Sequence, residues 1–259
     1  MRLDQFIVNN RLQTSRERTK RAIISGQVFV NGKVVTTPSF KVNGDEKITF
    51  ADDILTYVSR GALKLKKALE IFNVDVNDRY VLDIGSSTGG FTEVSLEYGA
   101  SNVIALDVGT NALHEKLRSN PKVIVMENTD FRQVEPSKIS QANLIVTDVS
   151  FISLRHIFPK IKQVFGTIEI IALFKPQFEC GEILAKKYKG VIKDKSIHKS
   201  LLNEFVYYIR ELGYNLSDIS YSPITGKEGN IEYLLHINGS GKKSFNISDI
   251  VEEAFLTNK

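Results

Sequence analysis

Hydrophobic positions in the first 50 residues fit two short helices and a hairpin. Apolar residues at Leu3, Phe6 and Ile7 predict a first short helix. A capping box at Thr14–Glu17 opens a second helix, which runs through Ser25. The alternating pattern that follows predicts a hairpin of strands 28–30 and 33–35 about an Asn-Gly turn, and a further strand over 47–50.

After residue 53 the pattern changes to strands that alternate with helices. Apolar runs predict strands at 81–84, 103–107, 123–126, 144–147, 169–173, 216–222 and 233–237, and helices at 89–98, 197–212 and 247–255. Such alternation indicates an α/β fold, a doubly wound, Rossmann-like parallel sheet. The change of pattern predicts a small α+β domain over residues 1–52 and a larger domain over 53–259. Ligands of doubly wound sheets bind at the carboxyl ends of the strands.

Basic residues are concentrated in the smaller segment. Residues 1–50 hold nine Lys and Arg against four acids, whereas the other 209 residues hold 25 basic and 26 acidic side chains. A basic module joined to a nearly neutral body is suited to binding a polyanion. The alternative is an ordinary solvated surface. A solvated surface does not explain why the basic residues are concentrated in one short segment.

The composition argues against several other classes of protein. Hydrophobic residues make up 42% and charged residues 25% of the chain, which is typical of a globular protein. The longest apolar run, Ile168–Phe174, is too short to cross a bilayer, and no apolar signal segment follows Met1. A single cysteine, Cys180, and four dispersed histidines give neither a disulfide framework nor zinc spacing. We therefore expect a cytoplasmic protein without a metal site or a membrane span.

A glycine-rich turn, Leu82–Phe91, follows the first strand of the larger domain. Its glycines let the chain bend sharply and let a ligand approach the backbone closely. The spacing of Gly85 from Gly89-Gly90 differs from the G-x-G-x-x-G of NAD sites, and Asp83 lies inside the strand. The turn therefore favours S-adenosylmethionine, although turns of this kind also hold dinucleotides.

The residues around this turn have distinct candidate roles in holding the cofactor. Methyltransferases commonly carry an acid at the position of Asp83, where it meets the amino-acid end of the ligand. Asp107 is placed to accept the ribose hydroxyls, and Asp130-Phe131 to read the adenine. A cap or turn role is the alternative for each single acid. The candidate cofactor-binding residues are Asp83, Gly85, Ser86, Ser87, Gly89, Gly90, Phe91, Asp107, Asp130 and Phe131.

Four charged residues lie at the ends of predicted elements. Lys64 opens a helix, Asp148 and Lys175 end the fourth and fifth strands, and Glu232 lies at the start of the last strand. Taken singly, each has an ordinary explanation as a solvated lysine or a helix cap. Because the strand ends meet at one edge of the sheet, surface placement does not readily explain all four.

The first 50 residues resemble the small RNA-binding module of ribosomal protein S-four, pseudouridine synthases and tyrosyl-tRNA synthetases. The resemblance rests on two basic helices followed by a G-x-V-x-V-N-G-K hairpin at residues 26–33. It implies an RNA partner, held by phosphate contacts that position the RNA without specifying its sequence. The implied RNA-binding residues are Arg2, Arg11, Arg16, Arg18, Lys20, Arg21 and Lys33.

The whole chain resembles the TlyA family, often labelled hemolysins, whose catalytic domain is similar to the FtsJ-type RNA ribose 2′-O-methyltransferases. Three segments carry the resemblance: Ser-Arg-Gly at 59–61, Lys-Pro-Gln-Phe-Glu at 175–179, and Ser-Pro-Ile-x-Gly-x-x-Gly-Asn-x-Glu at 222–232. It implies methyl transfer from S-adenosylmethionine to a cytidine 2′-hydroxyl of ribosomal RNA, and the short C-terminal tail favours the large subunit. The implied catalytic tetrad is Lys64, Asp148, Lys175 and Glu232.

The chemistry of this reaction leaves two roles open for Lys175. A ribose hydroxyl needs a base, or a positive charge that stabilises the developing alkoxide. An ordinary lysine amine is protonated at pH 7 and must have a lowered pKa to act as a base. Asp148 and Glu232 favour the charged form, so the electrostatic role is at least as well supported. Lys64 and Glu232 would orient the ribose and Lys175.

Other functions fit the sequence less well. Cytosine C5 methylation uses a cysteine after proline, but Cys180 follows Glu179. Amino-group methylation usually uses an Asn/Asp-Pro-Pro-aromatic turn, where this chain has residues 148–151, Asp-Val-Ser-Phe. Two further alternatives are a non-catalytic RNA- or ribosome-binding factor, which the intact tetrad disfavours, and a membrane-active hemolysin. The second is disfavoured because no signal, span or amphipathic membrane helix is visible.

Overall fold

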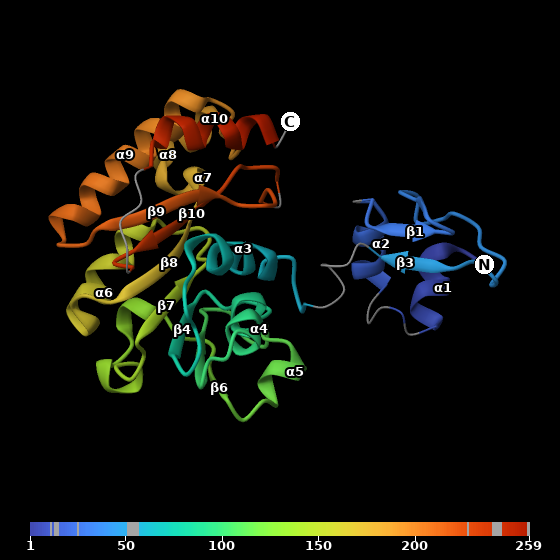
Figure 1. The fold of residues 1–259 in the computed structure, drawn as a ribbon, viewed down its shortest axis with the longest axis horizontal. Coiled ribbons are helices and arrows are strands. Elements are labelled where there is room, and N and C mark those ends of the chain that lie inside the picture. The colour runs from blue at the N-terminus through green and yellow to red at the C-terminus, as the bar shows by residue number, and fades with distance from the viewer. Residues whose placement is uncertain are drawn as a thin grey trace. The chain divides into compact units, whose positions relative to one another are not determined.

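The computed structural model describes residues 1–10, 12, 16–24, 26–50, 57–226, 228–239 and 245–257, without the side chains of residues 17, 18 and 21 (Figure 1). Two compact units are present, Met1–Arg60 and Gly61–Lys259. The predicted boundary between residues 52 and 53 lies outside the described residues and stays a prediction. The predicted cap residues Thr14 and Ser15 also lie outside them.

The first unit has two helices and a three-stranded antiparallel sheet of order β2-β1-β3. Its elements are α1 (Leu3–Asn9), α2 (Arg16–Ile24), β1 (Val28–Val30), β2 (Lys33–Val34) and β3 (Ile48–Phe50). At the hairpin, Asn31 and Gly32 have φ angles of 50° and 78°, the left-handed pair that an Asn-Gly turn adopts readily. Leu3, Ile7 and Ile23 are fully buried in the core of this unit. The predicted helices and hairpin are confirmed.

The second unit is built on a seven-stranded sheet of order β6-β5-β4-β7-β8-β10-β9. Strands β4 to β8 run parallel, and β10 runs antiparallel to both of its neighbours. The central strands β4, β7 and β8 are buried almost throughout, as expected when helices cover both faces. The strands are β4 (Tyr80–Ile84), β5 (Asn102–Leu106), β6 (Val123–Met126), β7 (Leu144–Thr147), β8 (Glu169–Phe174), β9 (Leu216–Tyr221) and β10 (Tyr233–Ile237).

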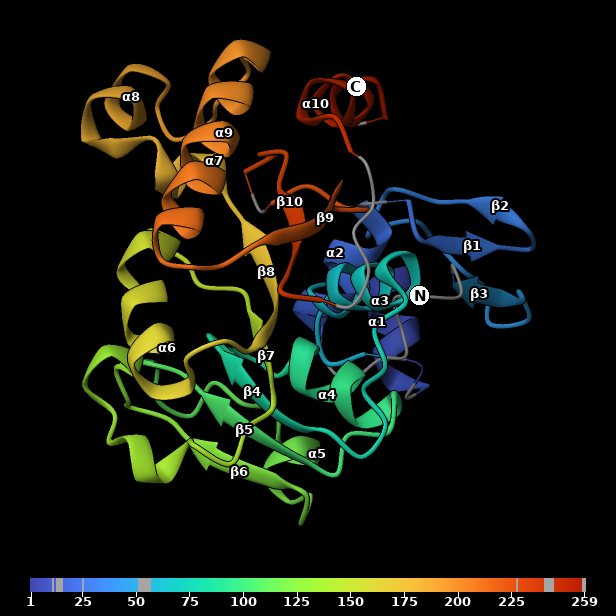
Figure 2. The same cartoon turned by 60° about the vertical axis from the view of Figure 1, so that its left-hand side comes forward.

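Helices lie on both faces of this sheet (Figures 1 and 2). On one face, α3 (Ala62–Phe72) packs against α4 (Gly90–Glu97), while α6 (Phe158–Phe165) and α9 (Lys195–Glu211) cover the other face. No described helix has both the length and the apolar character needed to cross a membrane. The remaining helices are α5 (Glu115–Arg118), α7 (Pro176–Glu179), α8 (Gly181–Lys187) and α10 (Ile247–Thr257), with 3-10 turns η1 (Phe131–Gln133), η2 (Pro136–Lys138) and η3 (Leu154–His156).

The predicted doubly wound α/β sheet is confirmed, although β10 runs antiparallel and the short helices α5, α6, α7 and α8 are not among the predicted helices. Helix α6 is not among the predicted elements, because a proline in its first turn and its short length hide the helical pattern. Strand β5 ends one residue earlier than predicted. Asp107 leaves the strand because its carboxylate accepts hydrogen bonds from the backbone N–H groups of Gly109 (2.7 Å) and Ser87 (2.8 Å).

We predict that the two cores respond separately to mutation. Ile23→Ala leaves a cavity in the core of the first unit and is expected to destabilise it by about 2–5 kcal/mol. Hydrogen exchange should then accelerate in α1, α2 and β1 while β4 to β8 keep their protection. Ile161→Ala, in the fully buried part of α6, is the matched variant and should do the reverse. Loss of protection throughout the chain in either variant would contradict two separate units.

Candidate active site

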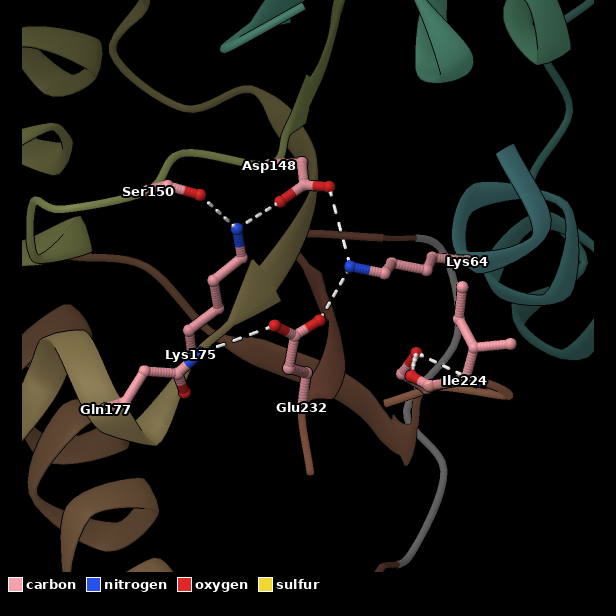
Figure 3. Close-up of polar contacts among 8 residues, drawn as sticks. Lys64, Asp148, Ser150, Lys175, Gln177, Ile224 and Glu232 are labelled. Carbon is pink, nitrogen blue, oxygen red and sulfur yellow. Dashed lines mark hydrogen bonds and ion pairs between the residues drawn. The ribbon is translucent and has the colours of Figure 1, made fainter. Parts of the chain in front are cut away.

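Lys64, Asp148, Lys175 and Glu232 meet at the carboxyl edge of the sheet (Figure 3). Lys64 lies in the first turn of α3, Asp148 follows β7, Lys175 follows β8, and Glu232 directly precedes β10. Because β10 is antiparallel to β8, its first residue lies beside the last residue of β8. The strand topology therefore brings together four residues that are far apart in the sequence.

The four side chains form a row of alternating charge. Lys64 Nζ lies 2.6 Å from Glu232 Oε2 and 3.7 Å from Asp148 Oδ2, and Lys175 Nζ lies 2.5 Å from Asp148 Oδ1. The row thus runs Glu232–Lys64–Asp148–Lys175 and its formal charges cancel. Lys64, Lys175 and Glu232 are less than a tenth exposed, whereas the side chain of Asp148 is 20% exposed.

Burial makes this pairing obligatory. A charge taken out of water without a partner is strongly destabilising, and each ammonium here has at least one carboxylate in contact. The Lys175 ammonium is therefore a positive charge held in a fixed position. Such a charge is suited to stabilising a developing oxyanion on a group that approaches Asp148 and Lys175.

Two further polar side chains hold the row in place, and the sequence did not single them out. Lys175 Nζ donates a hydrogen bond to Ser150 Oγ at 2.8 Å, and Gln177 Nε2 donates to Glu232 Oε1 at 3.5 Å (Figure 3). Each lies two residues after a member of the row, Asp148 or Lys175. That offset, in the segments that follow β7 and β8, is the sequence signal that could have found them.

Glu232 is set by the loop that precedes β10. Its backbone carbonyl accepts a hydrogen bond from Ser222 N at 2.8 Å, and Gly226 N donates to Asn230 O at 2.8 Å. A Cβ added to Gly226 would lie 2.7 Å from Glu232 Oε1. The glycine of the Ser-Pro-Ile-x-Gly segment is therefore required because the carboxylate occupies the space of its side chain.

The glycine-rich turn after β4 lies directly against the acceptor side of the site. Gly85 and Gly89 have φ angles of 86° and 96°, which strongly favour glycine. A Cβ on Gly85 would lie 3.0 Å from the backbone oxygen of Asp148, and one on Gly89 would collide with the side chains of Leu113 and Leu117. At both positions glycine is thus needed, because the φ angle is positive and because neighbouring atoms occupy the space that a Cβ would take.

The residues of this turn fit S-adenosylmethionine. Asp83 Oδ1 and Ser86 Oγ are buried without a hydrogen-bond partner among the described residues, and such atoms normally find one. The cofactor's ammonium and hydroxyl groups would supply donors. Asp107 is held nearby through Ser87, as described above, with lone pairs remaining for ribose hydroxyls. Among the described residues, no three His, Cys, Asp or Glu side chains are grouped so as to hold a metal ion.

Asp83 is the most perturbed acid of the site. It has no exposed surface, and this burial raises the pKa of its carboxyl to about 7. The hydrogen bond that Thr92 Oγ1 donates to it at 2.6 Å acts in the opposite direction, while the negative charge of Asp148 adds to the increase. A cationic ligand group would favour the ionised form.

The two predicted adenine contacts have protein partners of their own. Asp130 forms a salt bridge with Arg132 at 2.6 Å, and Phe131 is buried in the main core. Their contact with the cofactor stays a prediction. Val108, directly after Asp107, is 70% exposed and offers an apolar surface that sequence reasoning missed. An exposed valine after a strand-end acid is the signal that could have identified it.

Of the seven predicted RNA-binding residues of the first unit, four have described side chains, and these four fall into two groups. Arg2 and Arg16 pair with the buried Asp4, at 3.0 Å and 3.5 Å, so they also stabilise the fold. Lys20 on α2 and Lys33 on β2 are exposed and have their charges in solvent. Arg11 and the side chains of Arg18 and Arg21 lie outside the described part of the chain.

An exposed aromatic residue lies next to the row of charges. Phe151 follows Ser150, is 92% exposed, and has a φ of 63°, which is rare for an aromatic residue. Its ring centroid is 5.2 Å from that of Phe178, whose ring lies 5.8 Å from Lys175 Nζ. A solvent-facing aromatic beside a polar site is suited to stacking on a nucleobase.

Known families match both units of the chain. The FtsJ-like methyltransferase family matches residues 57–239, and the S4 domain matches residues 1–48. The Bacillus subtilis protein YqxC, provisionally named an rRNA methyltransferase, is 42% identical over all of this chain and 95% of its own. The 23S rRNA (cytidine-2′-O)-methyltransferase TlyA of Campylobacter jejuni is 41% identical over 91% of this chain and 98% of its own.

Solved structures agree with these matches. A structure from Streptococcus thermophilus, provisionally named a hemolysin, is 36% identical and has a TM-score of 0.76, covering 99% of this chain and 96% of that one. A second, from Lactococcus lactis with the same provisional name, is 40% identical with a TM-score of 0.70 and covers 76% of this chain. Both units and their order along the chain are thus shared with relatives.

We predict that Asp83 makes the stability of the ligand-free protein depend on pH. Its folded-state pKa, about 7, is above the ordinary value of 3.8, so its stabilising contribution is complete below pH 3.8 and is lost as pH rises through 7. Asp83→Asn should therefore become more stable relative to wild type between pH 5 and 8, measured by denaturant unfolding. Asp45→Asn, at an exposed position, is the control. A constant difference across this range would contradict the prediction.

We also predict that Gly85→Ala impairs the site beyond its effect on the backbone. Gly166 is the matched control, since its φ is 62° and a Cβ there would meet nothing within 4 Å. Both substitutions should lower stability by roughly 1–2 kcal/mol through the left-handed backbone angle. Only Gly85→Ala should also weaken S-adenosylmethionine binding in calorimetry, because its Cβ presses on Asp148. Equal cofactor affinity in the two variants would show that the close approach is unimportant.

Proposed function

Because this chain belongs to the TlyA family of FtsJ-like methyltransferases, we propose that it transfers a methyl group from S-adenosylmethionine to the 2′-hydroxyl of a cytidine ribose in ribosomal RNA. The large-subunit RNA is the favoured substrate. The observation that carries the proposal is the buried row of charges formed by Lys64, Asp148, Lys175 and Glu232 beside the glycine turn. Relatives named for this reaction support it.

The row of charges is suited to activating a hydroxyl. A ribose 2′-hydroxyl is a poor nucleophile at neutral pH, so its oxygen must be stabilised as negative charge develops. Lys175 is held by Asp148 and Ser150, and its ammonium supplies that charge. In this role the oxygen would bond to the methyl carbon as the sulfonium S–C bond breaks, and the hydroxyl proton would pass to solvent water. Lys64 and Glu232 fix the row from the other end and orient the ribose. A neutral amine on Lys175 would instead accept the hydroxyl proton directly.

The cofactor side is arranged to align the two reactants. S-adenosylmethionine, when bound, supplies a methyl group activated by a sulfonium centre. Asp83, Ser86 and Asp107 would hold it, and Gly85 keeps this turn in contact with the backbone of Asp148. Alignment of reacting atoms by rigid elements can supply much of a rate enhancement.

The RNA part of the proposal is supported by features outside the row of charges. An S4 domain matches the first unit, where Lys20 and Lys33 expose their charges. Phe151 offers a stacking surface for the target base beside Lys175. Phosphate contacts position the strand, while the aromatic surface and the row of charges receive the nucleoside.

The decisive test is tritium transfer from labelled S-adenosylmethionine to ribosomal subunits from cells that lack this protein. We expect label in an alkali-resistant dinucleotide, and a loss of at least roughly 100-fold in rate for Lys175→Ala, as when an oxyanion-stabilising group is removed. Lys122→Ala, at an exposed position before β6, should keep the wild-type rate.

Lys175→Arg separates the two roles of Lys175. Arginine keeps the positive charge but cannot act as a base at neutral pH. Partial activity supports charge stabilisation, full activity refutes the base role, and loss as complete as in Lys175→Ala favours the base. No label on either subunit by wild type, despite cofactor binding, would overturn the proposed function in favour of a non-catalytic RNA-binding factor.

A further inference from the structure

A second concentration of lysines lies in the catalytic unit, in the last turn of α8 and the segment that leads to α9. Residues 186–193, which we name the lysine loop, contain four lysines and no acid. All four lysines, Lys186, Lys187, Lys189 and Lys193, are exposed. This local charge stands out because residues 51–259 together carry 25 basic and 26 acidic side chains.

Three described acids lie near this charge, and none forms a buried ion pair with it. Glu228 brings its carboxylate to the turn itself, since a Cβ added to Gly190 would lie 3.5 Å from Glu228 Oε2. Asp194, the nearest acid after the loop, accepts hydrogen bonds from Ser196 and caps α9. Lys186 pairs with Glu182 at 3.4 Å, but both side chains are more than 80% exposed, so the pair is weak. Lys189 and Lys193 form no ion pair with any described residue. The loop therefore carries excess positive charge in solvent.

Hydrogen bonds with two buried side chains nevertheless hold the backbone of the lysine loop in place. The amide of the buried Asn230 donates to Gly190 O at 2.8 Å and accepts from Ile192 N at 3.1 Å. His198, also buried, contacts Ile192 O through Nε2 at 3.0 Å. Lys189 and Lys193 thus lie on either side of a clamped turn, which lowers the entropy lost when a ligand binds them.

This clamp joins the lysine loop to the active site. Asn230 lies two residues before Glu232, and its carbonyl accepts a hydrogen bond from Gly226, the glycine packed against the Glu232 carboxylate. From the other side, α7 begins directly after Lys175 and leads into α8 (Figure 2). The lysine loop is therefore linked to Glu232 through Asn230 and Gly226.

The backbone conformation at Lys189 is unfavourable for a lysine, which indicates that its side chain has a function. Its φ is 48°, followed by 80° at Gly190, so the chain leaves α8 through two left-handed residues. Glycine or asparagine is usual at such a helix end, and another residue costs roughly 1–2 kcal/mol. A lysine is therefore not favoured there by the backbone.

We propose that the lysine loop binds phosphates of the RNA strand that flank the ribose in the active site. This inference rests on the proposed function, whose substrate must bring a phosphodiester backbone to this edge of the sheet. The exposed ammonium groups of Lys189 and Lys193, on a turn linked to the acceptor site through Asn230, are suited to such phosphates. They position the strand next to Lys175 without reading its sequence, and they add to the contacts of the first unit.

The test compares two variants with equal changes in charge. Lys189→Gly/Lys193→Ala removes two loop charges and relieves the backbone at 189. Lys122→Ala/Lys138→Ala removes two exposed charges before β6 and β7, at the opposite edge of the sheet. Binding of the full-length protein to radiolabelled 23S rRNA transcript is measured from 50 to 300 mM salt, with KM and kcat on large subunits measured in parallel.

We expect the loop variant to bind RNA roughly tenfold more weakly at 150 mM salt, with the slope of log K against log salt reduced by about 1.4–1.8. KM should rise with kcat unchanged, and the control variant should match wild type. An unchanged slope and affinity, or equal changes in both variants, would overturn the inference. Because binding is read without catalysis, RNA that is bound but not methylated by wild type would reject the proposed function alone.

Discussion

Mutual neutralisation of two lysines and two carboxylates is the constraint on which the catalytic unit depends. The starts of α3 and β10 and the ends of β7 and β8 meet at one buried position. They can do so only because the positive and negative side chains alternate there. Loss of one partner from a buried pair typically costs about 3–5 kcal/mol, since the other charge is left uncompensated. The antiparallel direction of β10 is essential, because it places Glu232 at the same edge as Lys175.

The row of charges also determines how the cofactor side is built. The backbone of Asp148 comes so close to Gly85 that a side chain at 85 would press on it, and the carboxylate of Glu232 does the same at Gly226. The glycine turn thus allows the backbone after β4 to approach Asp148 closely, which in the proposed function would bring the methyl donor near the acceptor. Proximity of the two halves explains why the charge of Asp148 helps to raise the pKa of the buried Asp83.

Much of this fold could be predicted because its signals are local. Hydrophobic periodicity predicted the strands and the helices α2, α4, α9 and α10 within one or two residues, whereas the short helices α5, α7 and α8 were not predicted. Asn31-Gly32 predicted its turn from side-chain preferences alone. The four residues of the row of charges were implied by the resemblance to the TlyA family, which rests on short sequence motifs. Helix α6 was missed because its proline and short length leave too little periodic signal.

The set of elements and the residue types at their ends follow directly from the order of amino acids in the chain. The tertiary structure alone decided which of those ends meet. Ser150 supports Lys175 across 25 positions, and Asn230 clamps Gly190 across 40. Such contacts depend on the order and direction of the strands, which are fixed by packing of the whole core. Strand order and direction produce no periodic pattern of residue types in the sequence. The high pKa of Asp83 likewise arises only when the fold removes water from it.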